Sequence, residues 1–268
     1  MKKVKVLVFS GYGLNCEEET RFAFDLAGAE AEIVHINDLI DGLKKIKDYQ
    51  ILAVPGGFSY GDDTGSGNAF AQKVKNHLWS QIKEFVEAGG LIIGICNGFQ
   101  ILTRLGLLPA LGQKYGEQQV ELLFNKTARY MTRWVDLKVT NDSPWFKGLD
   151  GFSAAIAHGE GKFYADEKTL AELKKKNLIA LKYVKGDICD YQDLEANPNG
   201  SLDDIAGITN ESGRILGLMP HPERAVFLSQ SPKWPWLKEN AKRKNRKLSQ
   251  YGLALQVFKN AVNYFKQK

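Results

Sequence analysis

The sequence predicts an α/β fold in which a doubly wound, mostly parallel sheet carries helices on both faces. Apolar runs of strand length alternate with helical segments through the first half of the 268-residue chain, and repeated strand–helix units form parallel sheets covered on both sides. Glycine-marked turns follow three of these strands, at residues 11–13, 55–67 and 94–98. In such a sheet, ligands gather outside the carboxyl ends of the strands, so these turns are where we expect the functional site.

The first half of the chain is expected to supply four strands and four helices. The strands are short runs rich in valine, isoleucine and leucine, at residues 4–9, 31–36, 51–54 and 91–95. The helices are expected from residue 16 to Gly28, over 38–47, over 70–88 and over 99–105. Asn15 is expected to cap the first of them.

The second half differs, because its strands are separated by turns rather than by helices. Asn210 to Gly213 is a hairpin signal, and the pattern adds antiparallel strands to the sheet at residues 135–139, 152–156, 178–183, 205–208 and 215–219. An amphipathic helix is expected over residues 253–265. No repeat, low-complexity tract or linker divides the sequence, so residues 1–268 are predicted to form a single domain.

The composition is that of an ordinary globular enzyme, with 44% apolar and 25% charged residues. The three cysteines show no metal-binding spacing, and their odd number argues against a disulfide framework. No apolar run is long enough to span a bilayer, and the N-terminus lacks a signal-peptide pattern. We therefore expect a cytoplasmic protein that binds no membrane.

One segment stands out against the mild net charge of +5: residues 233–247 carry seven basic residues and one acidic residue. Such a segment suits contact with an acidic partner or a polyanion. It equally suits a solvated surface loop and helix face. The sequence leaves its role open.

The strongest local signal for chemistry surrounds Cys96. A buried strand runs through Gly94-Ile95-Cys96-Asn97-Gly98 directly into a helix, which is the thiol version of a nucleophile elbow. The helix N-terminus beside the sulfur favours the thiolate, and the amide of Asn97 can donate to a developing oxyanion. A lone cysteine is more often structural, but the flanking glycines favour a reactive one. Cys16 and Cys189 lack such a context and are expected to be structural.

Among the four histidines, His221 is the predicted base. It follows a predicted strand within Met-Pro-His-Pro-Glu-Arg, whose prolines favour extended backbone. In an extended chain, positions i and i+2 point the same way, so Glu223 can orient the imidazole. His35 and His77 are expected to be structural. His158, between Ala157 and a Gly-Glu-Gly stretch, is either a loop residue with a function or part of a polar turn, and its role stays open.

The loop after the third strand has the sequence Pro-Gly-Gly-Phe-Ser-Tyr-Gly-Asp over residues 55–62. Paired glycines let backbone amides face a substrate closely. An amide near Gly57 and that of Asn97 could together bind an oxyanion. The loop could also cradle a phosphate, but it lacks the Gly-Lys-Ser/Thr ending of a P-loop.

With these residues in view, the chain resembles the class I (triad) glutamine amidotransferases. Within them it is similar to the glutaminase subunits of phosphoribosylformylglycinamidine synthase. The matching motifs occur in the same order as in that family and run from about residue 4 to residue 225. They are NCEEET at 15–20, PGGFSYGD at 55–62, GICNGFQ at 94–100, HGEGKFY at 158–164, NPNGS at 197–201 and MPHPER at 219–224.

The resemblance implies a flavodoxin-like domain that forms a thioester on Cys96 and releases ammonia from glutamine. It implies His221 and Glu223 as the partners of that cysteine. It also implies that the loop containing Phe58 and Ser59 lies against the bound glutamine, together with Gln100.

The resemblance further implies a larger synthetase that uses ATP and Mg²⁺ and converts formylglycinamide ribonucleotide to its amidine in purine biosynthesis. Whether a small third subunit bridges the two is left open, and no cofactor, metal or nucleic acid is expected on this chain. Residues 63–67 depart from the usual family continuation, and residues 170–185 and 229–250 look longer than in the shortest members. A stand-alone cysteine hydrolase and a non-catalytic binding module remain as alternatives, and the full triad argues against both.

Overall fold

The computed structural model describes residues 3–267 and contains a nine-stranded sheet across the middle of the molecule. Its parallel part has the order β2-β1-β3-β4-β11, in which every neighbouring pair is parallel. This is the flavodoxin-like order, with β11 in the fifth place. The bounds are β1 Lys5–Ser10, β2 Glu30–His35, β3 Ile51–Val54, β4 Leu91–Ile95 and β11 Ile215–Leu218.

The rest of this sheet is antiparallel and continues from β11 in the order β10-β9-β6-β7. The predicted class, a mostly parallel doubly wound sheet with antiparallel strands added by the second half, is therefore confirmed. The bounds are β6 Met131–Val139, β7 Gly151–His158, β9 Ile179–Val184 and β10 Ile205–Thr209.

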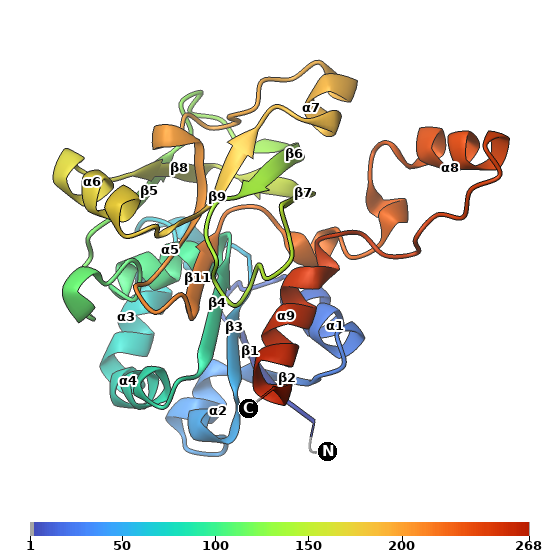
Figure 1. The fold of residues 1–268 in the computed structure, drawn as a ribbon. Coiled ribbons are helices and arrows are strands. Elements are labelled where there is room, and N and C mark those ends of the chain that lie inside the picture. Colours follow the sequence, from blue (N-terminus) through green and yellow to red (C-terminus); the bar gives the residue numbers. More distant parts are fainter. Residues whose placement is uncertain (1–2, 268) are drawn as a thin grey trace.

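Helices cover both faces of the parallel strands (Figure 1). On one side lie α1 (Glu17–Leu26) and α9 (Leu255–Lys266), where the rings of Phe24 and Phe258 meet edge to face at 5.0 Å. On the other side lie α3 (Asn68–His77), α4 (Trp79–Glu87) and α5 (Asn97–Arg104). Strands β3, β4 and β11 are buried along their whole length, as expected for a parallel sheet covered on both faces.

Three local predictions were wrong. The helix predicted over 38–47 is only α2 (Ile36–Ile40), because the chain turns at Gly42, whose φ of +74° is left-handed. The helix predicted over 70–88 is two helices, α3 and α4, separated at the fully buried Leu78. Asn15 does not cap α1, since the N-cap position is Cys16 and no side chain caps it.

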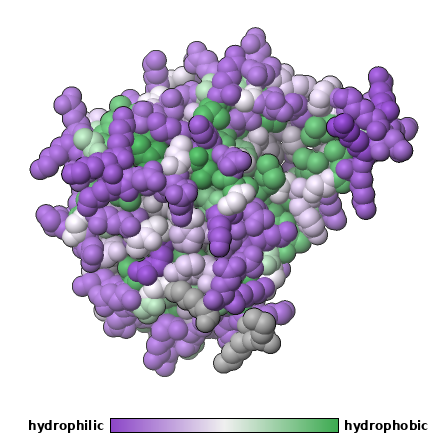
Figure 2. All heavy atoms as spheres, viewed as in Figure 1, coloured by the Kyte–Doolittle hydropathy of each residue, from purple (hydrophilic) through white to green (hydrophobic). Residues whose placement is uncertain are grey.

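Several elements of the second half had no sequence prediction. Strands β5 (Glu121–Phe124) and β8 (Glu160–Tyr164) form a separate antiparallel pair. The helices are α6 Glu167–Lys175, α7 Asp187–Gln192 and α8 Trp234–Arg243, and the short 3₁₀ turns are Ile46–Asp48, Ser59–Asp62, Leu111–Gln113, Leu202–Asp204, Pro222–Arg224 and Leu228–Gln230. Helix α8 stands away from the body of the molecule (Figure 1) and is strongly hydrophilic (Figure 2).

Among residues 3–267, one buried apolar cluster extends through both halves of the chain and includes residues of the parallel and the antiparallel strands. This continuity supports the prediction of one domain, which stays a prediction. Within residues 3–267, no helix is long and apolar enough to cross a membrane. All three cysteines are buried and free.

Candidate active site

The loops that leave the carboxyl ends of β1, β3, β4 and β11 meet at one edge of the sheet. The loop after β1 is joined to the loop after β3, because the amides of Asn15 and Cys16 both donate to the Gly56 carbonyl at 3.1 Å. The amide of Phe58 donates back to Gly13 at 2.9 Å. The turns predicted to form the site therefore lie together.

Cys96 occupies a sharp turn between β4 and α5. Its φ of 51° and ψ of −107° lie outside the favoured regions for a residue with a side chain. A Cβ added to Gly94 would lie 2.6 Å from the carbonyl oxygen of Gly98. A Cβ added to Gly98 would lie 1.9 Å from the carbonyl oxygen of Val54. The glycines two residues before and two after the cysteine are therefore required by close backbone packing, as the elbow interpretation predicts.

The elbow holds the Cys96 sulfur at the tip of the strand, largely shielded from solvent. Its side chain is buried and its sulfur lies 3.7 Å from the Ala157 carbonyl of β7. The amide of Asn97 is the first of α5, and the first amides of a helix have no acceptor within the helix. That amide is therefore free to donate toward a group bound at the cysteine.

His221 and Glu223 form a buried hydrogen-bonded pair. Their Nδ1 and Oε1 atoms are 2.5 Å apart, and each residue is about 2% exposed. The contact was predicted from extended backbone, but residues Pro222–Arg224 form a 3₁₀ turn. The amide of His221 donates to Ala155 of β7 at 2.8 Å, which fixes the loop against the sheet.

Burial and charge act on His221 in opposite directions. Burial lowers its pKa, whereas the carboxylate of Glu223 and the nearby sulfur of Cys96 raise it, and the pKa ends well above its ordinary value. Nε2 is buried and makes no hydrogen bond with any of the described residues. The ring can therefore hold a proton on Nδ1 against Glu223 and exchange another at Nε2.

The predicted oxyanion and substrate residues contact one another and the neighbouring loops. The Asn97 side chain accepts from the Ser59 amide at 3.1 Å and donates to Gln100 at 2.8 Å. Gln100 in turn donates to the Glu160 carbonyl at 2.5 Å, so its amide links the elbow to the start of β8. Gly57 pairs with the loop after β1 through an isolated antiparallel bridge.

Two of the residues predicted to contact glutamine, Ser59 and Phe58, have side-chain groups that other residues do not fully occupy or cover. The Ser59 hydroxyl is buried without a hydrogen-bond partner among residues 3–267. Phe58 is 43% exposed, and its ring centroid lies 6.0 Å from that of Tyr130. The roles of Phe58, Ser59 and Gln100 toward glutamine stay predictions.

The sequence interpretation missed Cys16 and Arg224 as neighbours of the triad. The Arg224 guanidinium donates to the Cys16 sulfur at 2.9 Å. A Cβ on Gly56 would lie 2.7 Å from Cε1 of His221 and 3.2 Å from that sulfur. Cys16 therefore borders the same space as the predicted base. The only sequence signal for a place of Cys16 at the site was its position in the motif NCEEET at residues 15–20.

Comparison with known proteins settles the family. Residues 3–265 match the family described as the CobB/CobQ-like glutamine amidotransferase domain. The chain belongs to this family. This glutamine amidotransferase is therefore an enzyme of the class that the motifs predicted.

Named relatives cover nearly the whole chain. The phosphoribosylformylglycinamidine synthase subunit PurQ of Methanococcus maripaludis is 53% identical over 97% of this chain and 98% of that protein. The PurQ subunit of Dehalococcoides mccartyi is 42% identical over the full length of both. A chain in the structure of PurLQS from Thermotoga maritima has a TM-score of 0.71 and 31% identity, covering 98% of this chain and all of that one.

His158, whose role the sequence left open, is a buried residue of this amidotransferase held by Asn199. The Asn199 amide nitrogen lies 3.0 Å from Nε2 of His158 and donates to Gly161 at 2.8 Å. The Asn199 oxygen accepts from both the amide and the hydroxyl of Ser201, which fixes the amide orientation. Nε2 of His158 must therefore be an acceptor, so the imidazole is neutral and carries its proton on Nδ1.

His158 should make folding sensitive to acid. Burial, aided by the positive charge of His221, lowers the pKa of His158 to about 3, compared with about 6.5 in an unfolded chain. As pH falls below about 6.5 the unfolded state binds this proton and the folded state does not, so stability is lost between about pH 6.5 and 3. His221 has a raised pKa, so its own contribution is present below about 6.5 and lost only at higher pH.

A His158→Gln variant should therefore show a smaller loss of stability on acidification than the wild-type chain. The difference in slope should approach about 1.4 kcal/mol per pH unit. Urea unfolding at a series of pH values from 6.5 to 5 measures both slopes. Equal slopes would mean that His158 takes up a proton as readily in the folded state as in the unfolded chain, contrary to the hydrogen-bond pattern.

Proposed function

We propose that Cys96, His221 and Glu223 catalyse the glutaminase reaction of a phosphoribosylformylglycinamidine synthase. The named PurQ relatives, similar along nearly their full lengths, support the assignment to this synthase. The chain hydrolyses glutamine to glutamate and ammonia. The ammonia then converts formylglycinamide ribonucleotide to formylglycinamidine ribonucleotide on a partner.

The observation that carries this proposal is the buried His221–Glu223 pair beside the elbow cysteine. A Cβ built on Gly56 would lie 2.7 Å from Cε1 of His221 and 3.5 Å from Cβ of Cys96, so the two residues border the same space. Glu223 holds the imidazole through Nδ1, so that Nε2 is the position from which protons are exchanged. A raised pKa at His221 favours an imidazolium, which pairs with a thiolate at Cys96. An ion pair of this kind supplies a nucleophile at neutral pH.

Catalysis then follows from the positions of these groups. The Cys96 thiolate attacks the side-chain amide carbon of glutamine, and the amides of Gly57 and Asn97 stabilise the oxyanion. His221 protonates the leaving nitrogen, and ammonia departs as the thioester forms. Water, deprotonated by His221, attacks the thioester and releases glutamate with regeneration of the thiolate. Each step uses side chains, backbone amides and water.

The same proposal covers substrate and partners. Phe58, Ser59 and Gln100 line the glutamine site, with the free hydroxyl of Ser59 as a hydrogen-bonding group. ATP and Mg²⁺ belong to a larger synthetase on which this chain docks. The likeness to a chain of PurLQS supports an assembly of that kind, including a small bridging subunit.

A Cys96→Ala variant tests the proposal in the assembled synthetase. Glutamine-driven formation of the amidine should be lost, because no thioester can form. Synthesis from an added ammonium salt should continue at the wild-type rate, since the ammonia-using site lies on the partner. Retention of glutamine-driven synthesis would refute the nucleophile. Loss of the ammonium-driven reaction would refute the separation of the two sites.

A further inference from the structure

The second thiol at the active site, Cys16, has no role in the proposed reaction. It is buried at the start of α1, and its sulfur accepts a hydrogen bond from Arg224 at 2.9 Å. Arg224 also lies 3.7 Å from Glu19, so its charge is shared with a surface carboxylate. A cysteine held by a guanidinium next to the predicted base requires an explanation of its own.

Cys16, His221 and Glu223 bring three donor atoms together, a thiol sulfur, an imidazole nitrogen and a carboxylate oxygen, all within 4.8 Å of one another. The three residues are buried. Oε2 of Glu223 has no hydrogen-bond partner within the described part of the chain. A buried polar atom without a partner is costly, and it marks a place where a further group can bind.

Sulfur, imidazole and carboxylate are the donors that Zn²⁺ takes in proteins. With bonds of about 2.0–2.3 Å, donors on a tetrahedral zinc lie roughly 3.3–3.8 Å apart. Nδ1 of His221 and Oε1 of Glu223 are 2.5 Å apart and must move apart by about 1 Å to admit the ion, while the Cys16 sulfur must approach them by a similar distance. Hydrogen bonds to a metal-bound sulfur are common in the surroundings of such sites, so Arg224 can stay in contact with Cys16.

The donor set also suits a divalent cation. Cys16 supplies a thiol and His221 an imidazole, and a cation that binds these two groups displaces the protons that they carry.

We propose that Cys16, His221 and Glu223 form a binding site for a zinc-class divalent cation that inhibits the glutaminase. The bound cation takes the imidazole and the carboxylate away from proton transfer, so ammonia release stops. These three ligands are sufficient, so binding of the cation does not require the Cys96 sulfur. This inference concerns metal binding and can fail while the proposed glutaminase function stands.

Co²⁺ can replace Zn²⁺ as a coloured probe with the full-length chain. Titration should give one bound ion per chain with a thiolate-to-metal charge-transfer band, in both the wild-type chain and a Cys96→Ser variant. Cys16→Ser should lose that band and bind at least about 10-fold more weakly, because a ligand is lost. The matched control is Cys189→Ser, since Cys189 is also buried but lies in α7.

Zn²⁺ alone should inhibit glutamine hydrolysis reversibly, with relief by a chelator, and Cys16→Ser should need at least about 10-fold more Zn²⁺. Urea midpoints measured for each variant show whether it is folded, and Cys16→Ala provides a second substitution if the serine variant is not. Three results would overturn the proposal: no thiolate band in the wild-type chain, a band that depends on Cys96 rather than Cys16, or equal Zn²⁺ sensitivity in the Cys16 variants.

Discussion

A His221→Ala variant is expected to lose glutamine-driven turnover by about 10⁴-fold or more. General acid–base catalysis alone is worth about 10²–10⁴, and triad members act as a unit, so removing one loses more. The steady-state rate of glutamate release in the assembled synthetase measures the effect. The matched control is His77→Ala, because His77 is exposed at the end of α3 and should leave turnover unchanged.

Glu223→Ala should cost less than His221→Ala, and it should also change the pH dependence. The Glu223 carboxylate helps to raise the pKa of His221, so its removal should move the limb of the pH–rate profile set by His221 to lower pH. A full-rate His221→Ala enzyme would exclude His221 as the base. An unshifted profile in Glu223→Ala would exclude the electrostatic role of the carboxylate.

Gly98→Ala should have the largest effect of any methyl addition at the site. A Cβ there would lie 1.9 Å from the Val54 carbonyl oxygen and 2.7 Å from its carbon, so backbone rather than a flexible side chain must move. Overpacking typically costs 1–3 kcal/mol, and this contact should reach about 3 kcal/mol or more. The displaced elbow should also lose glutaminase activity in any fraction that folds.

Urea unfolding measures the loss of stability in Gly98→Ala, and Gly159→Ala is the matched control. At Gly159 the nearest atom to an added Cβ is Cδ2 of Tyr130, at an ordinary 3.9 Å. We expect the Gly159 variant to unfold near the wild-type midpoint. Equal midpoints for the Gly98 and Gly159 variants would show that the elbow has room for a side chain.

The parallel half of the fold and the elbow could be predicted from the sequence because their signals are local. Strands such as Leu91–Ile95 are continuous apolar runs, and both faces of these strands are indeed covered. The glycines around Cys96 each lie two residues from it in the sequence, and this spacing alone predicts the sharp turn. Because parallel strands end at one edge of the sheet, the loops of the site could also be placed together.

Features that depend on tertiary contacts were missed. Cys16 and Arg224 are separated by more than 200 residues in the sequence, and only the fold brings the guanidinium onto the sulfur. The break between α3 and α4 falls at Leu78, which is buried. Leu78 is apolar and fits the helical spacing of its neighbours, so the sequence pattern continues through it and does not show that one helix ends and another begins. The tautomer of His158 depends on Asn199, from a distant loop.

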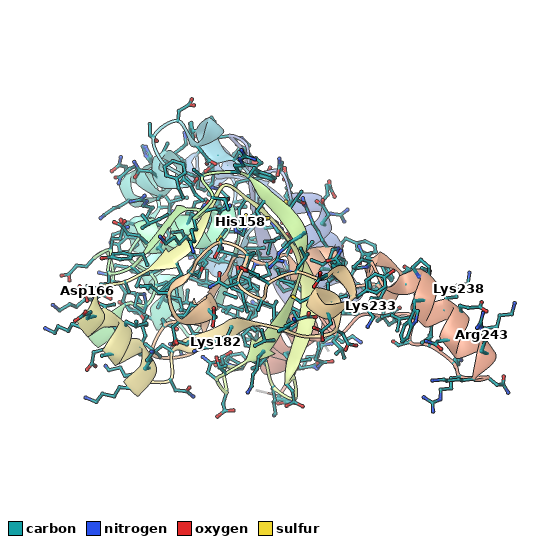
Figure 3. The ribbon with its side chains drawn as sticks, turned by 90° about the horizontal axis from the view of Figure 1, so that it is seen from above. His158, Asp166, Lys182, Lys233, Lys238 and Arg243 are labelled. Atoms are coloured by element: carbon teal, nitrogen blue, oxygen red, sulfur yellow. The ribbon has the colours of Figure 1, made fainter. Side chains whose placement is uncertain are left out.

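The basic segment 233–247, whose role the sequence left open, contains α8. Lys238 and Arg243 lie on this helix, well away from the body of the molecule (Figure 3). Lys233, at its base, packs over the ring of Trp236 at 5.0 Å and pairs with Asp187 at 3.2 Å. In the isolated chain, the segment therefore contains a projecting helix, and most of its charged side chains lie at the surface.

Covalent labelling by an electrophilic glutamine analogue tests the central claim most directly, because two thiols, those of Cys16 and Cys96, lie close to Gly56 and to His221. The account predicts that intact mass will increase by one equivalent and that peptide mapping will place the label on Cys96. A Cys16→Ser chain should be labelled at the same residue, whereas Cys96→Ala should not be labelled. A label on Cys16 or Cys189 in the wild-type chain would contradict the assignment of Cys96 as the nucleophile.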